Sequence, residues 1–215
     1  MATPDSLKLD AGRRAWEFTA RHPDPSEAGQ RAAAELGRLL VAARGVMQEQ
    51  LTFGEALGRA TGELGVLGRP LRDALAVITH FGSVAALRRR RPDLRIQLRT
   101  RPRQPNAFLA EARSIQRQAL VDEELLLHYG MHRDLLPRLA RDLDRFEAAL
   151  ARRDLAAEGI RRVRADLTAI AQEVYGLIRR LDAMYRPRFA GAPELLAEWT
   201  RARAIQENRG RESVA

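Results

Sequence analysis

The sequence predicts an all-α protein: a helical bundle built around a long antiparallel helix hairpin, over about residues 106–186, with additional N-terminal helices. Three observations predict this class. Good helix formers are abundant and aromatic residues make up only 5% of the 215 residues, so a core of Leu, Ala, Val and Ile is expected. Apolar residues recur with helical periodicity in several segments. A very short connection separates the two longest of these segments, as in a helix hairpin.

The N-terminal part is expected to supply helices that cover the hairpin. Residues 10–21 predict a short helix that ends at the His-Pro pair 22–23, and Ser26 is a suitable N-cap for a helix over about 27–50. The pattern continues through 54–68, but this stretch contains five glycines, each of which costs a helix up to ~1 kcal/mol relative to alanine. It is expected to form either a weak helix with a close-packing face or a helix broken into turns.

Prolines mark the expected ends of the remaining elements outside the hairpin. Pro70 is expected to begin a helix that ends near residue 91, since proline suits the first helical turn. Residues 94–100 alternate between apolar and polar types, but with no partner strand they predict an extended connector. Pro193 begins a last helix over about 193–207.

The first arm of the hairpin spans about 106–150 and carries an irregular apolar stripe. Pro137 predicts a kink or short break near 131–137, because proline removes one helical hydrogen bond. Asp122 and Arg133 fall on the stripe. They are expected either to pair across helices or to mark positions where the stripe rotates.

The second arm, about 155–186, is the most regular segment of the chain. Asp154 is a plausible N-cap, and Pro187 predicts the end of the helix. Only residues 151–153 separate the two arms, so the chain is predicted to reverse there. The apolar residues of the second arm recur at alternating steps of three and four: Ile160, Val163, Leu167, Ile170, Val174, Leu177, Leu181 and Met184.

These elements predict two regions. Residues 1–105 form an N-terminal helical region with a basic helix end and connector at 70–105, and residues 106–207 form the helical hairpin plus a C-terminal helix. A single domain is the alternative at this chain length.

The composition excludes several classes of protein. The chain has no cysteine, which excludes disulfides, thiolate metal sites and thiol chemistry. Its first residues lack the apolar core of a signal peptide, and no stretch approaches the ~18 apolar residues of a membrane helix. A cytoplasmic protein without membrane contact is therefore expected. The motifs of phosphate-binding loops, dinucleotide folds and serine hydrolases do not occur, so neither an enzyme nor a bound cofactor is expected.

The distribution of charge gives the clearest indication of a partner. Of the net charge of +9, +7 lies in residues 70–105, which hold nine arginines and two aspartates. Exposed arginines at this density predict contacts with the phosphates of a nucleic acid. No aromatic residue separates the arginines of 88–103, so a stacking platform for single strands is missing there. The candidate polyanion-binding residues are Arg88, Arg89, Arg90, Arg91, Arg95, Arg99, Arg101 and Arg103.

Other interpretations of the basic segment stay open. The arginines form a solvated helix end and linker, or they offset the charge of acids such as Asp122, Glu123 and Glu124. The chain has one lysine against 36 arginines, also in its neutral regions, which is typical of a GC-rich genome. A winged-helix arrangement with helices at 51–60 and 71–79 has a longer and more glycine-rich turn than the usual connection of about 3–4 residues.

His128 and His132 are the only weak candidates for a metal site. Their spacing of four would place both on one helical face, where two imidazoles can share a metal ion. Third and fourth ligands cannot be placed, so exposed helix residues are expected and no metal is assigned.

The sequence therefore favours a non-enzymatic interaction or scaffold protein that associates with itself as a dimer. The alternative is a DNA-binding regulator or nucleoid-type protein that uses the basic segment 70–105. An acidic protein is the other partner that this segment fits.

Overall fold

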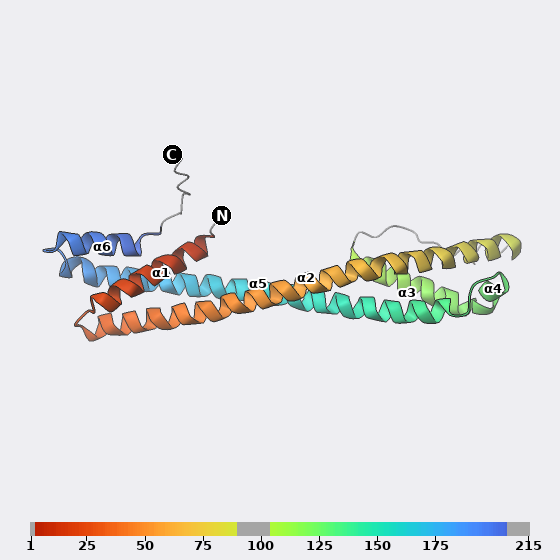
Figure 1. Cartoon of the computed structure of the whole chain (residues 1–215), viewed down its shortest axis with the longest axis horizontal. Helices are drawn as coiled ribbons and strands as arrows, with labels where there is room; N and C mark the ends of the chain where they lie inside the picture. The colour runs from red at the N-terminus through yellow and green to blue at the C-terminus, as the bar shows by residue number, and fades with distance from the viewer. Residues whose placement is uncertain (1–2, 90–103, 206–215) are drawn as a thin grey trace, which may run out of the picture. The chain divides into compact units, whose positions relative to one another are not determined.

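The computed structural model of the protein describes residues 3–89 and 104–205, and every regular element in these residues is an α-helix (Figure 1). The all-α class is thereby confirmed. The helices are α1 (Pro4–Arg21), α2 (Glu27–Arg89), α3 (Pro105–Val121), α4 (Glu123–His128), α5 (Leu135–Arg188) and α6 (Pro193–Arg203).

The chain divides into two compact units. The terminal unit consists of Met1–Thr52 and Gly159–Ala215, and the central unit consists of Phe53–Glu158. Each of the long helices α2 and α5 is divided between the two units, with one part in each. The boundaries therefore cut across these two helices, and they differ from the predicted division between 1–105 and 106–207.

Helix α2 is continuous where the sequence predicted a change. Neither the glycine-rich residues 54–68 nor Pro70 interrupts it, so the helix expected to begin at Pro70 is part of α2. Buried residues continue on one face on both sides of the proline, as at Leu64 and Leu71. Pro70 is exposed, and the carbonyl that loses its hydrogen-bond donor belongs to the exposed Val66. Water can satisfy this carbonyl, so packing on the other face keeps the helix intact.

Helix α5 is also continuous, so the reversal predicted at 151–153 is wrong. These residues are Ala, Arg and Arg, which favour helix, and the buried positions continue from Leu150 to Ala156. The chain reverses between α3 and α5 instead, through α4 and residues 129–134. Gly130 has a φ of 102° there, a left-handed conformation that favours glycine.

The predicted hairpin within 106–186 is thus formed by α3 and the first part of α5, inside the central unit. Phe108 of α3 contacts Phe146 of α5, with ring centroids 5.4 Å apart. Arg113, further along α3, hydrogen-bonds Asp144, which precedes Phe146 in α5. The two helices therefore run in opposite directions.

The irregularities predicted in the first arm mark helix ends. Asp122 lies between α3 and α4, and Arg133 lies in the turn before α5. Helix α5 begins at Leu135, which confirms the break predicted near 131–137. Pro137 falls in the first turn of α5, where a missing N–H costs little.

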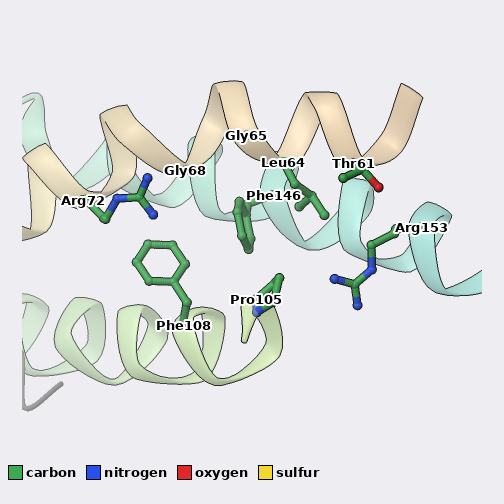
Figure 2. A pocket seen from close by; sticks show the side chains of 9 residues that line it. All are labelled: Thr61, Leu64, Gly65, Gly68, Arg72, Pro105, Phe108, Phe146 and Arg153. Atoms are coloured by element: carbon green, nitrogen blue, oxygen red, sulfur yellow. The ribbon is translucent and has the colours of Figure 1, made fainter. Parts of the chain in front are cut away.

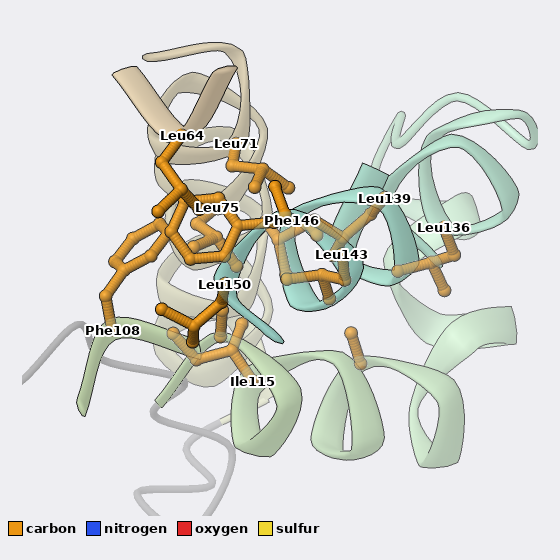
Figure 3. Packing of buried hydrophobic residues seen from close by; sticks show 14 of the residues in the cluster. Leu64, Leu71, Leu75, Phe108, Ile115, Leu136, Leu139, Leu143, Phe146 and Leu150 are labelled. Atoms are coloured by element: carbon orange, nitrogen blue, oxygen red, sulfur yellow. The ribbon is translucent and has the colours of Figure 1, made fainter. Parts of the chain in front are cut away.

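The core of the central unit is aliphatic, as the composition predicted. Figure 3 shows α2, α3 and α5 contributing side chains to one cluster, to which Phe108 and Phe146 add the aromatic rings. The buried leucines are Leu64, Leu71, Leu75, Leu126, Leu136, Leu139, Leu143 and Leu150.

The core of the terminal unit departs from the composition-based prediction because it gathers aromatic rings. Trp199 of α6 lies 5.2 Å from Phe18 and 4.9 Å from Tyr185, measured between ring centroids. Phe189 stacks on Tyr185 at 5.4 Å. The heptad stripe of α5 faces this core, where Val174, Leu177 and Leu181 are buried and Leu167 and Ile170 are partly buried. Scarce aromatic residues can still dominate one core when they are concentrated in it.

Candidate functional site

The predicted basic segment is described only at its beginning. Arg88 is exposed in the last turn of α2, and Arg89 is the last residue of that helix. The extended connector expected at 94–100 lies outside the described residues. So do the remaining predicted polyanion contacts, Arg90, Arg91, Arg95, Arg99, Arg101 and Arg103.

His128 and His132 do not share a helical face. Helix α4 ends at His128, and the left-handed Gly130 separates the two residues. The His128 ring lies edge-on to Tyr129 at 5.2 Å, and Nδ1 of His132 accepts a hydrogen bond of 3.2 Å from the backbone N–H of Asp134. Within the described residues, no three His, Asp or Glu side chains gather as metal ligands would. The spacing of four thus does not produce the shared face that it suggested.

The central unit contains a cleft of about 260 Å³ between α2, α3 and α5. Its floor is apolar and consists of the buried side chains of Leu64, Phe108 and Phe146. Figure 2 shows Arg72 and Arg153 at opposite ends of the cleft, with the two phenylalanine rings between them. The cleft therefore combines an aromatic surface with a cationic group at each end.

Local sequence features shape the walls of this cleft. Pro105 begins α3 at the cleft wall, and Phe108 follows one turn later on the buried side of the helix. On α2, a Cβ added at Gly65 would meet no atom within 4 Å, and one added at Gly68 would meet the Arg72 guanidinium at 3.5 Å. The α2 wall is thus bare backbone, along which the Arg72 side chain lies.

The two arginines at the ends of the cleft differ in their partners. Arg153 donates hydrogen bonds to Asp154 from Nε at 3.0 Å and from Nη2 at 2.5 Å. The Arg72 guanidinium lies over the Phe108 ring, with its central carbon 5.9 Å from the ring centroid. No carboxylate of the described residues forms an ion pair with Arg72. The charge of Arg153 is balanced locally, whereas that of Arg72 is not.

Ion pairs between helices hold the walls of the central unit in place. Nη2 of Arg113 in α3 donates to Asp144 at 2.6 Å and to Glu147 at 2.7 Å, both on α5. The hydrogen bonds to these two carboxylates raise the pKa of Arg113 above its ordinary value. Nη2 of Arg152 in α5 donates to both carboxylate oxygens of Glu63 in α2, at 2.8 and 2.7 Å. All three helices around the cleft are therefore linked by charge as well as by packing.

A second feature of the central unit is the side of α2 that points away from the core, here called the outer face of α2. It comprises Glu55, Gly58, Gly62, Val66 and Arg69. A Cβ added at either glycine would meet no atom within 4 Å, and the Val66 side chain is 75% exposed. The close-packing face expected from the glycines thus has no packing partner among the described residues.

Sequence reasoning did not find the cleft. The sequence predicted an apolar stripe on the arm that contains Phe108, but Arg72 and Arg153 lie far from Phe108 in the sequence and come from other helices. Helical spacing relates residues within one helix, so it cannot bring these three together. The glycine-rich stretch 54–68 was the one available signal, because it leaves the α2 wall without side chains.

Comparison with known proteins does not identify a relative. The chain matches no protein-family model, no curated protein and no solved structure. Among the helices that the structure describes, none combines the length and the apolar character needed to cross a membrane. The outer face of α2 and the cleft are therefore the features of the central unit that bear on function.

Proposed function

We propose that the protein is a non-enzymatic interaction protein that forms a symmetric dimer through the outer face of α2. The observation that carries this proposal is the open space over Gly58 and Gly62, opposite the buried side of the helix. Each glycine costs an exposed helix about 1 kcal/mol relative to alanine. No intramolecular contact over these glycines offsets that cost within the described residues. A second helix that approaches the bare backbone closely supplies the missing contact.

The outer face of α2 is also complementary to itself in charge. In an antiparallel pair centred on Gly62, Glu55 of one copy lies opposite Arg69 of the second copy, and Gly58 lies opposite Val66. Glu55 and Arg69 are both exposed, and neither forms an ion pair within the described residues. A two-fold interface repeats each contact twice, so one ion pair becomes two. This complementarity favours a second copy of the chain over an unrelated partner.

Sedimentation equilibrium at micromolar concentration tests the dimer. The wild type is expected at about twice the monomer mass of 24.1 kDa. Gly62→Leu places a large side chain at the centre of the pair and is expected to give the monomer mass. Gly45→Leu is the matched control, because Gly45 is also exposed on α2 with open space around it, but lies outside the outer face. A wild-type monomer, or equal dissociation in both variants, contradicts the proposal.

A charge reversal tests the antiparallel register separately. Glu55→Arg and Arg69→Glu each place like charges opposite one another, and each is expected to raise the dimer dissociation constant about 10-fold. The double variant restores opposite charges and is expected to recover most of the wild-type affinity. If the two losses of affinity add in the double variant, Glu55 and Arg69 do not lie opposite one another, and the antiparallel register is wrong.

The concentration of arginine at 70–105 supports a second candidate function, nucleic-acid binding. The observation in its favour is the net charge of +7 in that segment, which follows the exposed end of α2 at Arg88. Phosphate contacts release counterions, so affinity should fall steeply with salt, with a slope of about −0.9 per contact. Sequence preference should be weak, because contacts to the phosphate backbone do not read bases.

A gel-shift titration at several salt concentrations tests this second function. Changing Arg89, Arg91 and Arg99 to alanine is expected to weaken binding and to flatten the slope by about two to three units. If neither wild type nor variant shifts DNA or RNA at low salt, the nucleic-acid function is excluded. The basic segment then remains a solvated linker or a contact for an acidic protein.

A further inference from the structure

The cleft in the central unit has the dimensions of a small-ligand site. Its volume of about 260 Å³ lies just below the range of about 300–1,000 Å³ that drug-sized ligands occupy. It therefore suits a molecule with one ring or a short chain. The space arises where bare backbone at Gly65 faces the ring of Phe108, and neither residue belongs to the outer face of α2.

The floor of the cleft favours an apolar, planar body. Phe108 and Phe146 meet edge to face, with centroids 5.4 Å apart and an angle of 68° between the rings. This arrangement presents a ring face beside a ring edge, and both geometries are favourable for a third aromatic group. The ion pairs of Arg113 with Asp144 and Glu147 hold α3 and α5 together, so the floor is largely preformed.

The positive charge of Arg72 in the cleft favours a ligand with a negative charge. Arg72 keeps its N–H donors free of carboxylates among the described residues, and its guanidinium lies over the Phe108 ring, with its central carbon 5.9 Å from the ring centroid. Such a group donates two parallel hydrogen bonds to a carboxylate or phosphate. At the other end of the cleft, Arg153 already forms an ion pair with Asp154. The anionic end of a ligand therefore lies at Arg72.

We propose that the cleft binds a small organic anion: a carboxylate or phosphate monoester carried on one aromatic ring or a short aliphatic chain. The anionic group accepts hydrogen bonds from Arg72, and the apolar body lies over Phe108 and Phe146. The hydroxyl of Thr61, at the rim of the cleft, is available to a polar substituent of the ligand. The proposal does not depend on dimerisation through the outer face of α2.

Isothermal titration of the full chain with simple probes tests this assignment. Benzoate and phenyl phosphate carry both a ring and an anionic group. Acetate and inorganic phosphate carry only the charge, and benzyl alcohol carries only the ring. At least one of the two aromatic anions is expected to bind about 10-fold more tightly than each of the three partial probes. Whether benzoate or phenyl phosphate binds better distinguishes a carboxylate ligand from a phosphate ligand, and either result supports the site.

Two variants and one control locate the binding. Arg72→Gln is expected to weaken binding of the aromatic anion about 10-fold, because it removes the charge and the paired donors. Gly65→Leu fills the cleft from the α2 wall and is expected to abolish binding. Arg59→Gln removes the same charge from an exposed arginine elsewhere on α2 that neither lines the cleft nor belongs to the outer face of α2, and is expected to change affinity less than about twofold. Circular dichroism confirms that all three variants are folded.

Several outcomes would overturn the proposal. If neither aromatic anion binds better than the partial probes, the cleft does not recognise this class of ligand. Equal losses in Arg72→Gln and Arg59→Gln would assign any binding to diffuse positive charge. Unchanged affinity in folded Gly65→Leu would place the bound molecule elsewhere on the protein.

Discussion

Some glycines of the two units have opposite surroundings. In the terminal unit, glycines allow close contact inside the fold: a Cβ at Gly12 would overlap the side chain of Val174, and one at Gly29 would lie 2.5 Å from Cβ of Asp24. In the central unit, a Cβ on the outer face of α2 would meet nothing within 4 Å. Glycine therefore completes the packing at Gly12 and Gly29 of the terminal unit and leaves backbone bare at Gly58 and Gly62 of the central unit.

The cores of the two units also differ in how completely they are packed. In the terminal unit, the ring of Tyr185 contacts those of Phe18 and Trp199. The polar atoms of Tyr185 and Trp199 are hydrogen-bonded. The Tyr185 hydroxyl donates to the His22 carbonyl at 2.9 Å, and Trp199 Nε1 donates to Asp182 at 2.9 Å. The central unit packs leucines but leaves a cleft beside two phenylalanines. The terminal unit is suited to stability, and the central unit offers surfaces for binding.

The largest test of this contrast is Trp199→Ala. Trp199 is fully buried among Phe18 and Tyr185, so its loss is expected to reduce the free energy of unfolding by about 3–5 kcal/mol. Urea denaturation measures this change, and hydrogen exchange shows where it acts. Amide protection should fall in α1 and α6 and persist in α3, which lies wholly in the central unit. Equal loss of amide protection in α3 would mean that the two units unfold together. The units would then differ in their surfaces but not in their stability.

A pair of glycine substitutions tests the packing difference directly. Gly12→Ala forces Val174 to move within a buried contact and is expected to destabilise the protein by about 1–3 kcal/mol. Gly58→Ala adds a methyl group in open space and improves helix propensity, so it is expected to stabilise the monomer by up to about 1 kcal/mol. Thermal unfolding at concentrations below the dimer dissociation constant measures both. Changes of the same sign would show that local space does not decide the effect of these glycines.

The helices themselves follow from local sequence, and their interruptions do not. Ser26 was correctly predicted as the cap that precedes α2, since its hydroxyl accepts the backbone N–H of Gly29 at 3.1 Å. The prediction that Pro70 begins a helix was wrong. Proline inside a helix costs free energy because one carbonyl, here that of Val66, loses its hydrogen-bond donor. The size of this cost depends on whether the carbonyl is exposed to water, and the tertiary structure decides that. The turn at 151–153 was inferred from the short connection between two predicted helices. Helix α5 instead continues through these residues, with Leu150 before them and Ala156 after them both buried.

The candidate sites were predictable to different degrees. A close-packing face was one of two expectations for the glycines on α2, but spacing alone could not show that no helix of the described residues covers it. The cleft depends on the approach of Arg72 in α2 to Phe108 in α3, with the guanidinium carbon 5.9 Å from the ring centroid. Such a contact follows from packing that the periodicity of a single helix does not encode. The arginines beyond Arg89 remain a prediction from charge alone.

The smallest effect expected is that of Asp24→Asn at the start of α2, in the terminal unit. Asp24 is only 8% exposed, and its Oδ1 accepts hydrogen bonds from the hydroxyl of Ser26 at 2.5 Å and from its backbone N–H at 2.9 Å. The hydrogen bond from the Ser26 side chain holds the pKa of Asp24 below its ordinary value, and the charge of Arg188 at 3.8 Å acts in the same direction. The substitution is expected to cost about 1 kcal/mol at pH 7.

The sign of its pH dependence follows from the lowered pKa. Because the folded protein binds the proton less readily than the unfolded chain, the charged Asp24 stabilises the fold above the ordinary pKa of about 3.9. This contribution is lost as the pH falls through the folded pKa, so wild type and Asp24→Asn should converge in stability in acid. Asp142→Asn in the central unit is the control: its carboxylate lies 3.8 Å from Arg145 in a solvent-exposed pair, and the change should stay within about 0.5 kcal/mol. Denaturant titrations from pH 7 downward measure both variants. If the Asp24→Asn deficit persists unchanged in acid, the side chain acts through shape against Gly29 rather than through its charge.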